Sequence, residues 1–247
     1  MNKTEISWTD LTWNPVTGCS KVSPGCQNCY AEALYKRYHF DFTPMIHPEK
    51  LKQVKSIPAG SKVFVNSTSD LFHEDIHFSF IRDVMNAINS RPDVTFQILT
   101  KRPDNIKNFL ASGHYIPGNV WLGVSVEMRQ FAFRIFRLLE TTSFVSNMSH
   151  VRFVSFEPLI GDIGEIDFLG MVQWIIIGGE SGPNHRPFNP DWARNLIRQA
   201  KEQNVAVWMK QLGGFRPGNS MGELPEDLRI REFPETASPS NLTEAKQ

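Results

Sequence analysis

Short apolar runs alternate with amphipathic segments along most of the chain. The runs cover residues 62–67, 94–100, 120–126, 151–157, 173–179 and 205–210, and the amphipathic segments cover residues 31–40, 79–89, 103–112, 127–140 and 190–203. Strands that alternate with helices of this length predict βαβ units and a parallel sheet. The runs are almost continuously apolar, which is typical of strands that are buried on both faces.

Polar residues gather where the apolar runs end. Nearly every run is followed by a polar cluster, at 67–70, 100–102, 125–127, 157, 180–181 and 210–211. In parallel α/β folds the carboxyl ends of the strands carry the active site. We therefore expect residues 1–214 to form a single α/β domain, a complete or partial parallel barrel resembling a TIM barrel, with a site on that rim. Residues 215–247 are expected to be a C-terminal extension whose last part is disordered.

Charge and the N-terminal sequence limit the classes of partner. Lys and Arg number 26, as do Asp and Glu, so no overall field attracts nucleic acid or an anionic membrane. The first 15 residues are polar, without the apolar core of a signal peptide, and no apolar run has the length of a bilayer. The sequence predicts a cytoplasmic protein that does not use a membrane.

All three cysteines of the chain, Cys19, Cys26 and Cys29, lie in one loop rich in Gly and Pro, before the helix that Tyr30 begins. An odd number of thiols in the cytoplasm does not form a disulfide framework. Three thiolates can hold an iron–sulfur cluster with one open iron, or zinc if His39 or His47 supplies a fourth ligand. Alternatively, Cys26 and Cys29 can form a redox pair, or the three can be buried structural residues.

The three-cysteine loop ahead of the first helix of a parallel barrel resembles the radical S-adenosylmethionine (SAM) superfamily. That resemblance implies a [4Fe–4S] cluster on Cys19, Cys26 and Cys29, whose open iron binds SAM, and reductive cleavage of SAM to a 5′-deoxyadenosyl radical. It also implies a flavodoxin-like or ferredoxin-like reductant. The whole chain, from TWNPVTGC to WMKQLGG, further resembles an uncharacterised phage and prophage family with this three-cysteine signature.

Among characterised relatives the sequence is similar to the spore photoproduct lyase family. That family has Ser-Asp, Thr-Lys and Ser at the ends of its second, third and fourth strands, and this chain has Ser69-Asp70, Thr100-Lys101 and Ser125. By resemblance, Ser69, Lys101 and Ser125 would hold the amino-acid part of SAM. The cofactor site expected on these grounds comprises Ser69, Asp70, Lys101, Ser125, Glu127 and Glu157. Thr68 stands where that family has a hydrogen-donating thiol.

Other residues near the expected rim allow more than one interpretation. Glu157 can act as an acid or base, bind a ribose hydroxyl, or pair with Arg186 or Lys210. Glu180, in the stretch IIIGGESG, can contact a ligand directly. Alternatively, only the glycines of this stretch matter, because they let the backbone approach a ligand closely. His73 and His77 are expected in a loop, exposed to solvent, and the arginines of the helix at 131–140 are also expected in solvent.

The substrate is the least constrained part. A local group of cations near the rim favours a nucleic acid or nucleotide, completed by a partner protein if the barrel has no substrate domain of its own: Lys101, Arg102, Arg186, Lys210 and Arg216. The same cations can instead bind the carboxylate of a small molecule. The alternative to an enzyme is a zinc-stabilised module that binds nucleic acid or protein through the same cysteine loop.

Overall fold

An eight-stranded sheet organises the chain in the computed structural model, which describes residues 1–143, 151–215 and 223–235. Its order is β1-β2-β5-β6-β7-β8-β9-β10. β1 pairs antiparallel with β2, and each later neighbour pairs in parallel. The strands are β1 (Asn2–Lys3), β2 (Leu11–Trp13), β5 (Lys62–Val65), β6 (Thr95–Thr100), β7 (Val120–Ser125), β8 (Arg152–Phe156), β9 (Trp174–Gly178) and β10 (Ala206–Gln211). The prediction of an α/β fold with a mostly parallel sheet is confirmed.

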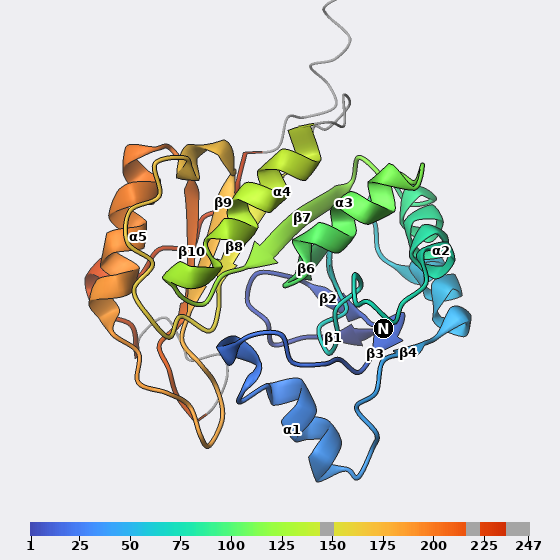
Figure 1. Cartoon of the computed structure of the whole chain (residues 1–247), viewed down its shortest axis with the longest axis horizontal. Helices are drawn as coiled ribbons and strands as arrows, with labels where there is room; N and C mark the ends of the chain where they lie inside the picture. The colour runs from blue at the N-terminus through green and yellow to red at the C-terminus, as the bar shows by residue number, and fades with distance from the viewer. Residues whose placement is uncertain (144–150, 216–222, 236–247) are drawn as a thin grey trace, which may run out of the picture.

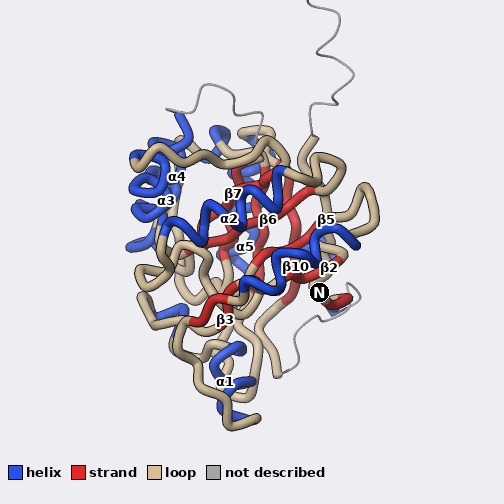
Figure 2. Tube along the Cα trace, turned by 90° about the vertical axis from the view of Figure 1, so that its right-hand side faces the viewer, coloured by secondary structure: helices blue, strands red, loops and turns tan. Residues whose placement is uncertain are grey.

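Five α-helices occupy the predicted amphipathic segments: α1 (Tyr30–Arg37), α2 (Phe78–Asn89), α3 (Pro103–Ala111), α4 (Phe133–Ser143) and α5 (Pro190–Glu202). Figure 1 shows α2 to α5 around the outside of the sheet, whereas α1 projects away from it. Figure 2 shows the same projection of α1 from the side. A small second sheet pairs β3 (Val16–Thr17) with β4 (Met45–Ile46) at the base of this projection. The cysteine loop and α1 therefore stand apart from the helical layer.

Both faces of the sheet are buried, which explains the continuous apolar runs. Along β5, Val63 and Val65 face the helices and belong to the main core cluster, while Phe64 faces the concave side. The alternation follows from the two-residue repeat of a strand. The concave side holds a second cluster rich in aromatic residues: Trp8, Phe64, Trp121, Val151, Phe153, Trp174, Ile176 and Trp208.

The sheet is strongly curved around Trp8. The ring centroid of Trp8 lies 4.7 Å from that of Phe64 on β5 and 6.1 Å from that of Trp174 on β9. In a flat sheet these two strands would be about 19 Å apart, because neighbouring strands are spaced by about 4.8 Å. One indole contacts both strands only if the sheet curls around it.

The curved sheet does not close into a complete barrel. In the described residues no strand ladder joins β10 to β1 or β2, so the closed form of the predicted barrel is not observed. Instead, Trp208 Nε1 on β10 donates a hydrogen bond of 3.1 Å to Ser7 Oγ in the segment between β1 and β2. Arg231 forms an antiparallel bridge with Trp208, which covers the free edge of β10.

Part of the expected C-terminal extension packs on the body of the protein. The ring of Phe233 lies 4.7 Å from that of Trp208 and 5.6 Å from that of Trp174, measured between centroids. Residues 236–247, where disorder is expected, lie outside the described residues, as does Arg216. Within the described part of the chain, no helix combines the length and apolar character needed to span a bilayer.

Candidate functional site at the carboxyl ends of the strands

A cavity of about 510 Å³ lies at the rim where the sequence predicts a site. Its wall includes the residues that follow β5 and β6, the ends of β7 and β8, and the turn after β9. All three cysteines line it. The polar clusters that end the apolar runs are thus brought together around one cavity. The N-terminal segment 3–6 also lines it, which the sequence did not predict because this segment has no hydrophobic period.

The cysteine loop approaches the cavity through a tight turn at Gly18. Gly18 has φ +76°, and a Cβ there would lie 2.2 Å from the carbonyl oxygen of Thr43, so only glycine fits. The next residue is fixed as well, because the amide of Cys19 donates to the carbonyl of Phe42 at 2.9 Å. Cys29 precedes the first residue of α1. The three thiols are free and partly exposed.

Arg102 anchors the first cysteine. Its guanidinium lies 3.6 Å from Cys19 Sγ and donates to Asp70 Oδ2 at 3.2 Å and to Glu74 Oε2 at 2.5 Å. It also donates to the hydroxyl of Ser20 at 2.8 Å. Arg102 is buried and fully used in these contacts, so this expected rim cation holds the loop rather than facing a substrate.

Electrostatics around Cys19 favour the protonated thiol. Burial and the Asp70 carboxylate raise the pKa of Cys19 to about 11, against the opposing effect of Arg102. The free thiol therefore keeps its proton near neutral pH. A metal ligand must be a thiolate, so metal binding here would release a proton.

His73 belongs to the same anchor. Its Nδ1 accepts the amide hydrogen of Asp75 at 3.1 Å, which leaves Nε2 as the donor to Ser20 Oγ at 2.7 Å. His73 is buried, so the prediction of a solvent-exposed histidine is wrong at this position. His77, by contrast, caps α2 by accepting the amide hydrogen of Ser79.

Glu180 anchors the other end of the cysteine loop. It accepts a hydrogen bond of 3.0 Å from Asn28 Nδ2 and pairs through both oxygens with Arg186. Arg186 also donates to the carbonyl of Pro24 at 3.0 Å. Burial would raise the pKa of Glu180, but the hydrogen bonds from Arg186 and Asn28 lower it below its ordinary value. Glu180 is thus occupied by the protein itself.

Five of the six expected cofactor residues line the cavity, and Glu127 does not. Ser69, Lys101, Ser125 and Glu157 line the cavity, and Lys101 Nζ has no partner among the described residues. Asp70 also lines the cavity, but its carboxylate accepts hydrogen bonds from Thr100 Oγ1 at 2.7 Å and from the Lys101 amide at 3.1 Å. Its role in this arrangement is to tie the end of β6 to the turn after β5.

Glu127 lies behind the cavity rather than on its surface. It is fully buried and pairs with Arg134 NH1 at 2.8 Å, and a Cβ on Gly25 would lie 3.0 Å from its carboxylate. Glu127 therefore supports the cysteine loop from beneath. The expectation that the arginines of this helix are solvated is wrong for Arg134, which is buried with its carboxylate partner.

Glu157 stands on the opposite side of the cavity, paired with Lys210. Lys210 Nζ lies 2.8 Å from Glu157 Oε1, which is one of the pairings expected from the sequence. A Cβ at Gly178 would lie 2.6 Å from Glu157 Oε1, so glycine leaves the room that this carboxylate occupies. We name Ser155, Glu157, Ser181 and Lys210, contributed by the last three strands and the turn after β9, the β8–β10 wall.

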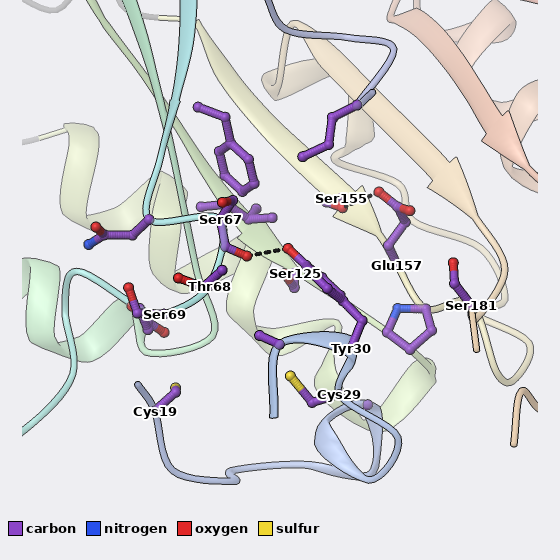
Figure 3. Close-up of a pocket in the computed structure, with 18 of the residues that line it drawn as sticks. Cys19, Cys29, Tyr30, Ser67, Thr68, Ser69, Ser125, Ser155, Glu157 and Ser181 are labelled. Atoms are coloured by element: carbon purple, nitrogen blue, oxygen red, sulfur yellow. Dashed lines mark hydrogen bonds between the residues drawn. The ribbon is translucent and has the colours of Figure 1, made fainter. Parts of the chain in front are cut away.

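Tyr30 lies between the two sides in Figure 3. Cys19, Thr68 and Ser69 appear on one side of its ring, and Ser155, Glu157 and Ser181 appear on the other. The phenol donates a hydrogen bond to the carbonyl of Ser67. Half of the Tyr30 residue is exposed, but desolvation of its hydroxyl, together with the nearby Cys29 and Glu157, raises its pKa.

The sequence suggests two metal groups for the three cysteines, a single zinc ion and a four-iron cluster, which need different arrangements of ligands. No three His, Cys, Asp or Glu side chains in the described ranges are gathered closely enough to ligate a single ion. His39 and His47 do not line the cavity, and His47 Nε2 is bonded to Thr17 Oγ1 at 2.7 Å. A four-iron cluster needs three thiolates that bind different irons and are spread around a larger group. Three thiols around one cavity match that donor set.

Comparison with protein families found one model that covers nearly the whole chain, residues 3–238, described as "Protein of unknown function (DUF5131)". The chain belongs to this family. The cysteine loop, both anchors and the β8–β10 wall all fall inside the range that the DUF5131 model matches. No curated protein matches the chain. The phage association of the family stays a prediction.

Among solved structures this DUF5131 member is similar to spore photoproduct lyase. A cysteine-to-serine variant of that enzyme aligns with 13% identity and a TM-score of 0.49, covering 81% of this chain and 63% of the lyase. A double variant described with bound AdoMet and dinucleoside spore photoproduct aligns with 13% identity and a TM-score of 0.45, covering 77% and 61%. The DUF5131 chain thus spans less than two thirds of the length of these enzymes.

Proposed function

We propose that this protein is a radical SAM-type enzyme, in which Cys19, Cys26 and Cys29 hold a [4Fe–4S] cluster. The observation that carries the proposal is that three free thiols from one short loop face the same cavity as the ammonium of Lys101, which has no partner among the described residues. When bound, such a cluster supplies the electron that cleaves SAM to methionine and a 5′-deoxyadenosyl radical. That electron comes from an external reductant of the flavodoxin or ferredoxin class.

The chain's own residues would orient the amino-acid part of SAM. Lys101 can donate to its carboxylate. The hydroxyl of Ser69 donates to the carbonyl of Val16 at 2.8 Å, so its remaining lone pairs can accept from the amino group. Ser125 has its backbone carbonyl bound by Arg134 at 2.9 Å and lines the cavity. Asp70 and Glu127 are proposed as positioning residues beneath these groups, and Glu157 faces them from the other wall.

Under this proposal, the hydrogen bonds of Arg102 and Glu180 keep the cysteine ligands in position. A three-ligand cluster is held only if the loop presents its thiolates at fixed spacing, and side chains locked by hydrogen bonds keep such ligands in position. Arg102 fixes the loop at Cys19, and Glu180 fixes it through Asn28, between Cys26 and Cys29. The two anchors come from different strand ends, so the folded sheet sets the distance between the cysteines.

Metal analysis tests this proposal. The full chain, reconstituted without oxygen, should bind about four irons and four sulfides and absorb broadly near 400 nm. The variants Cys19→Ala, Cys26→Ala and Cys29→Ala should each lose most of the iron, whereas the control Ser112→Ala, at an exposed position that does not line the cavity, should not. Colourless protein with one zinc per chain would instead support the zinc-stabilised binding module.

A further inference from the structure

The ion pair of the β8–β10 wall is shielded but still open to a ligand. The side chains of Lys210 and Glu157 are 18% and 16% exposed, so each keeps a face toward the cavity. The second oxygen of Glu157 has only a long hydrogen bond of 3.4 Å from Ser155 Oγ. The wall therefore offers an ammonium donor next to a carboxylate acceptor.

This donor–acceptor pair does not favour an anion. The charge of Lys210 is neutralised by Glu157 at 2.8 Å, and a phosphate placed on Lys210 would lie beside that carboxylate. Arg186, the other cation expected to bind phosphate, is occupied by Glu180 and Pro24. A neutral group that presents an acceptor and an N–H side by side complements the wall better.

The interior of the same cavity is apolar and partly aromatic, with the rings of Trp8 and Phe64 tilted by 58° to each other. Trp8 and Phe64 line it with ring centroids 4.7 Å apart, and Leu99 and Ile6 add apolar surface. Aromatic side chains in a cavity stack on planar heterocycles of any sequence. A planar ring can pack against one of these rings and the apolar side chains beside it, with its polar edge toward Glu157 and Lys210.

We infer that the β8–β10 wall binds the edge of a planar heterocycle in which a ring N–H adjoins a carbonyl, as in uracil and guanine. Glu157 accepts the ring N–H, and Lys210 donates to the carbonyl oxygen. This inference rests on the proposed function, because it leaves the side of the cavity with the cysteines, Ser69 and Lys101 to SAM. The substrate of that site would then be a nucleoside or nucleotide that is recognised through the edge of its base and not through a phosphate.

Calorimetric titration of the full chain with uridine and guanosine tests this inference. The apo protein should bind both, and 3-methyluridine and 1-methylguanosine, which lack the ring N–H, should bind about 10-fold to 100-fold more weakly. This comparison needs no variant, so misfolding does not affect it. Equal binding of the methylated and unmethylated nucleosides would overturn the inference.

Variants place the binding at the wall. Glu157→Gln and Lys210→Met should each weaken uridine binding about 10-fold or more, and Lys107→Met, at an exposed ion pair with Glu140 outside the cavity, should not. A single-stranded oligonucleotide of the same bases shows whether the natural ligand is a nucleic acid or a free nucleoside or nucleotide. Tighter binding of the oligonucleotide than of the nucleoside indicates a nucleic acid, and equal binding indicates a free nucleoside or nucleotide. Unchanged affinity in both wall variants would contradict the assignment.

Competition separates this inference from the proposed function. In reconstituted protein, saturating SAM should leave uridine bound, because the two occupy different sides. Displacement of uridine by SAM would show that the wall belongs to the cofactor and would overturn the inference. Absence of iron with intact uridine binding would overturn the proposed function alone, because the titrations of apo protein do not depend on the cluster.

Discussion

Asn28, between the second and third cysteines, donates a hydrogen bond of 3.0 Å to Glu180, a residue 152 positions later in the chain. Glu180 holds the same loop a second time through Arg186, whose guanidinium reaches the carbonyl of Pro24. The loop that carries the thiols is therefore positioned by the turn after β9. Its geometry depends on the whole sheet, not on the local sequence alone.

Removing the Glu180 carboxylate should loosen this loop. Glu180→Ala removes the carboxylate that accepts from Arg186 and Asn28 and leaves each with a backbone carbonyl alone, so we expect the free energy of unfolding to fall by about 2 kcal/mol. Urea denaturation of the apo protein measures this change. Glu202→Ala, at an exposed pair with Arg198, is the matched control and should cost less than about 0.5 kcal/mol. A Glu180 variant as stable as the control would contradict the anchor.

Gly18 should not tolerate a side chain. Gly18 and Gly60 have nearly the same backbone, with φ +76° and φ +78°, but a Cβ at Gly60 meets nothing within 4 Å. Alanine should cost about 1 kcal/mol at Gly60 through left-handed strain alone. At Gly18 the added contact with Thr43 should raise the loss to about 3 kcal/mol. Thermal unfolding of the two variants checks this, and equal losses would contradict the close approach.

The anchor at Glu74 gives a defined pH dependence. Partial desolvation would raise its pKa, although the side chain is 55% exposed, but the hydrogen bond and charge of Arg102 lower it from 4.5 to about 2. A carboxyl with a lowered pKa stabilises the fold above the unfolded value, and this contribution is lost as pH falls through the folded value.

We therefore expect wild type and Glu74→Gln to differ in urea midpoint by a constant amount above about pH 5. The difference should shrink as the pH falls from there toward 2, because the carboxyl is protonated first in the unfolded chain and then, near pH 2, in the folded protein as well. Urea titrations of both proteins over this range measure it. A difference that grows as the pH falls would contradict the pairing with Arg102.

Lys101 should contribute to SAM affinity. A charge-assisted hydrogen bond to a carboxylate is worth about 1.5–3 kcal/mol, so Lys101→Met should weaken SAM binding about 10-fold to 150-fold. Equilibrium dialysis with reconstituted protein measures the affinity, and Lys107→Met serves as the control. Iron content should be unchanged, because Lys101 is not a ligand. Wild-type affinity in Lys101→Met would remove it from the cofactor site.

The sequence predicted the position of the site because polar residues end each buried strand, and parallel strands end at one rim. The polar clusters that contain Ser69, Lys101 and Ser125 were located in this way, the family resemblance selected these three within the clusters, and all line the cavity. The short strand β2, with three residues, carries too little pattern to be recognised. The contribution of residues 3–6 to the cavity wall was not predicted, for the same reason.

The sequence offered Arg186 and Lys210 as alternative partners of Glu157, but it could not decide between them and gave no partner for Glu180. Lys210 and Arg186 were expected to be rim cations that face a substrate, but each is paired with a carboxylate, Glu157 and Glu180. Glu157 and Lys210 are 53 positions apart in the sequence, and the neighbouring positions of β8, β9 and β10 in the sheet bring them to 2.8 Å, across Gly178 of β9. Because pairing depends on tertiary packing, a count of cations overestimates the charge that a ligand meets.

The central claim is that this cavity cleaves SAM by one-electron reduction. The most direct measurement is chromatographic detection of 5′-deoxyadenosine after the reconstituted full chain is incubated with SAM and dithionite without oxygen. Wild type should form 5′-deoxyadenosine and methionine in equal amounts, and Cys26→Ala should form neither. A wild-type protein that contains about four irons per chain and binds SAM, but forms no 5′-deoxyadenosine under these conditions, would contradict the account.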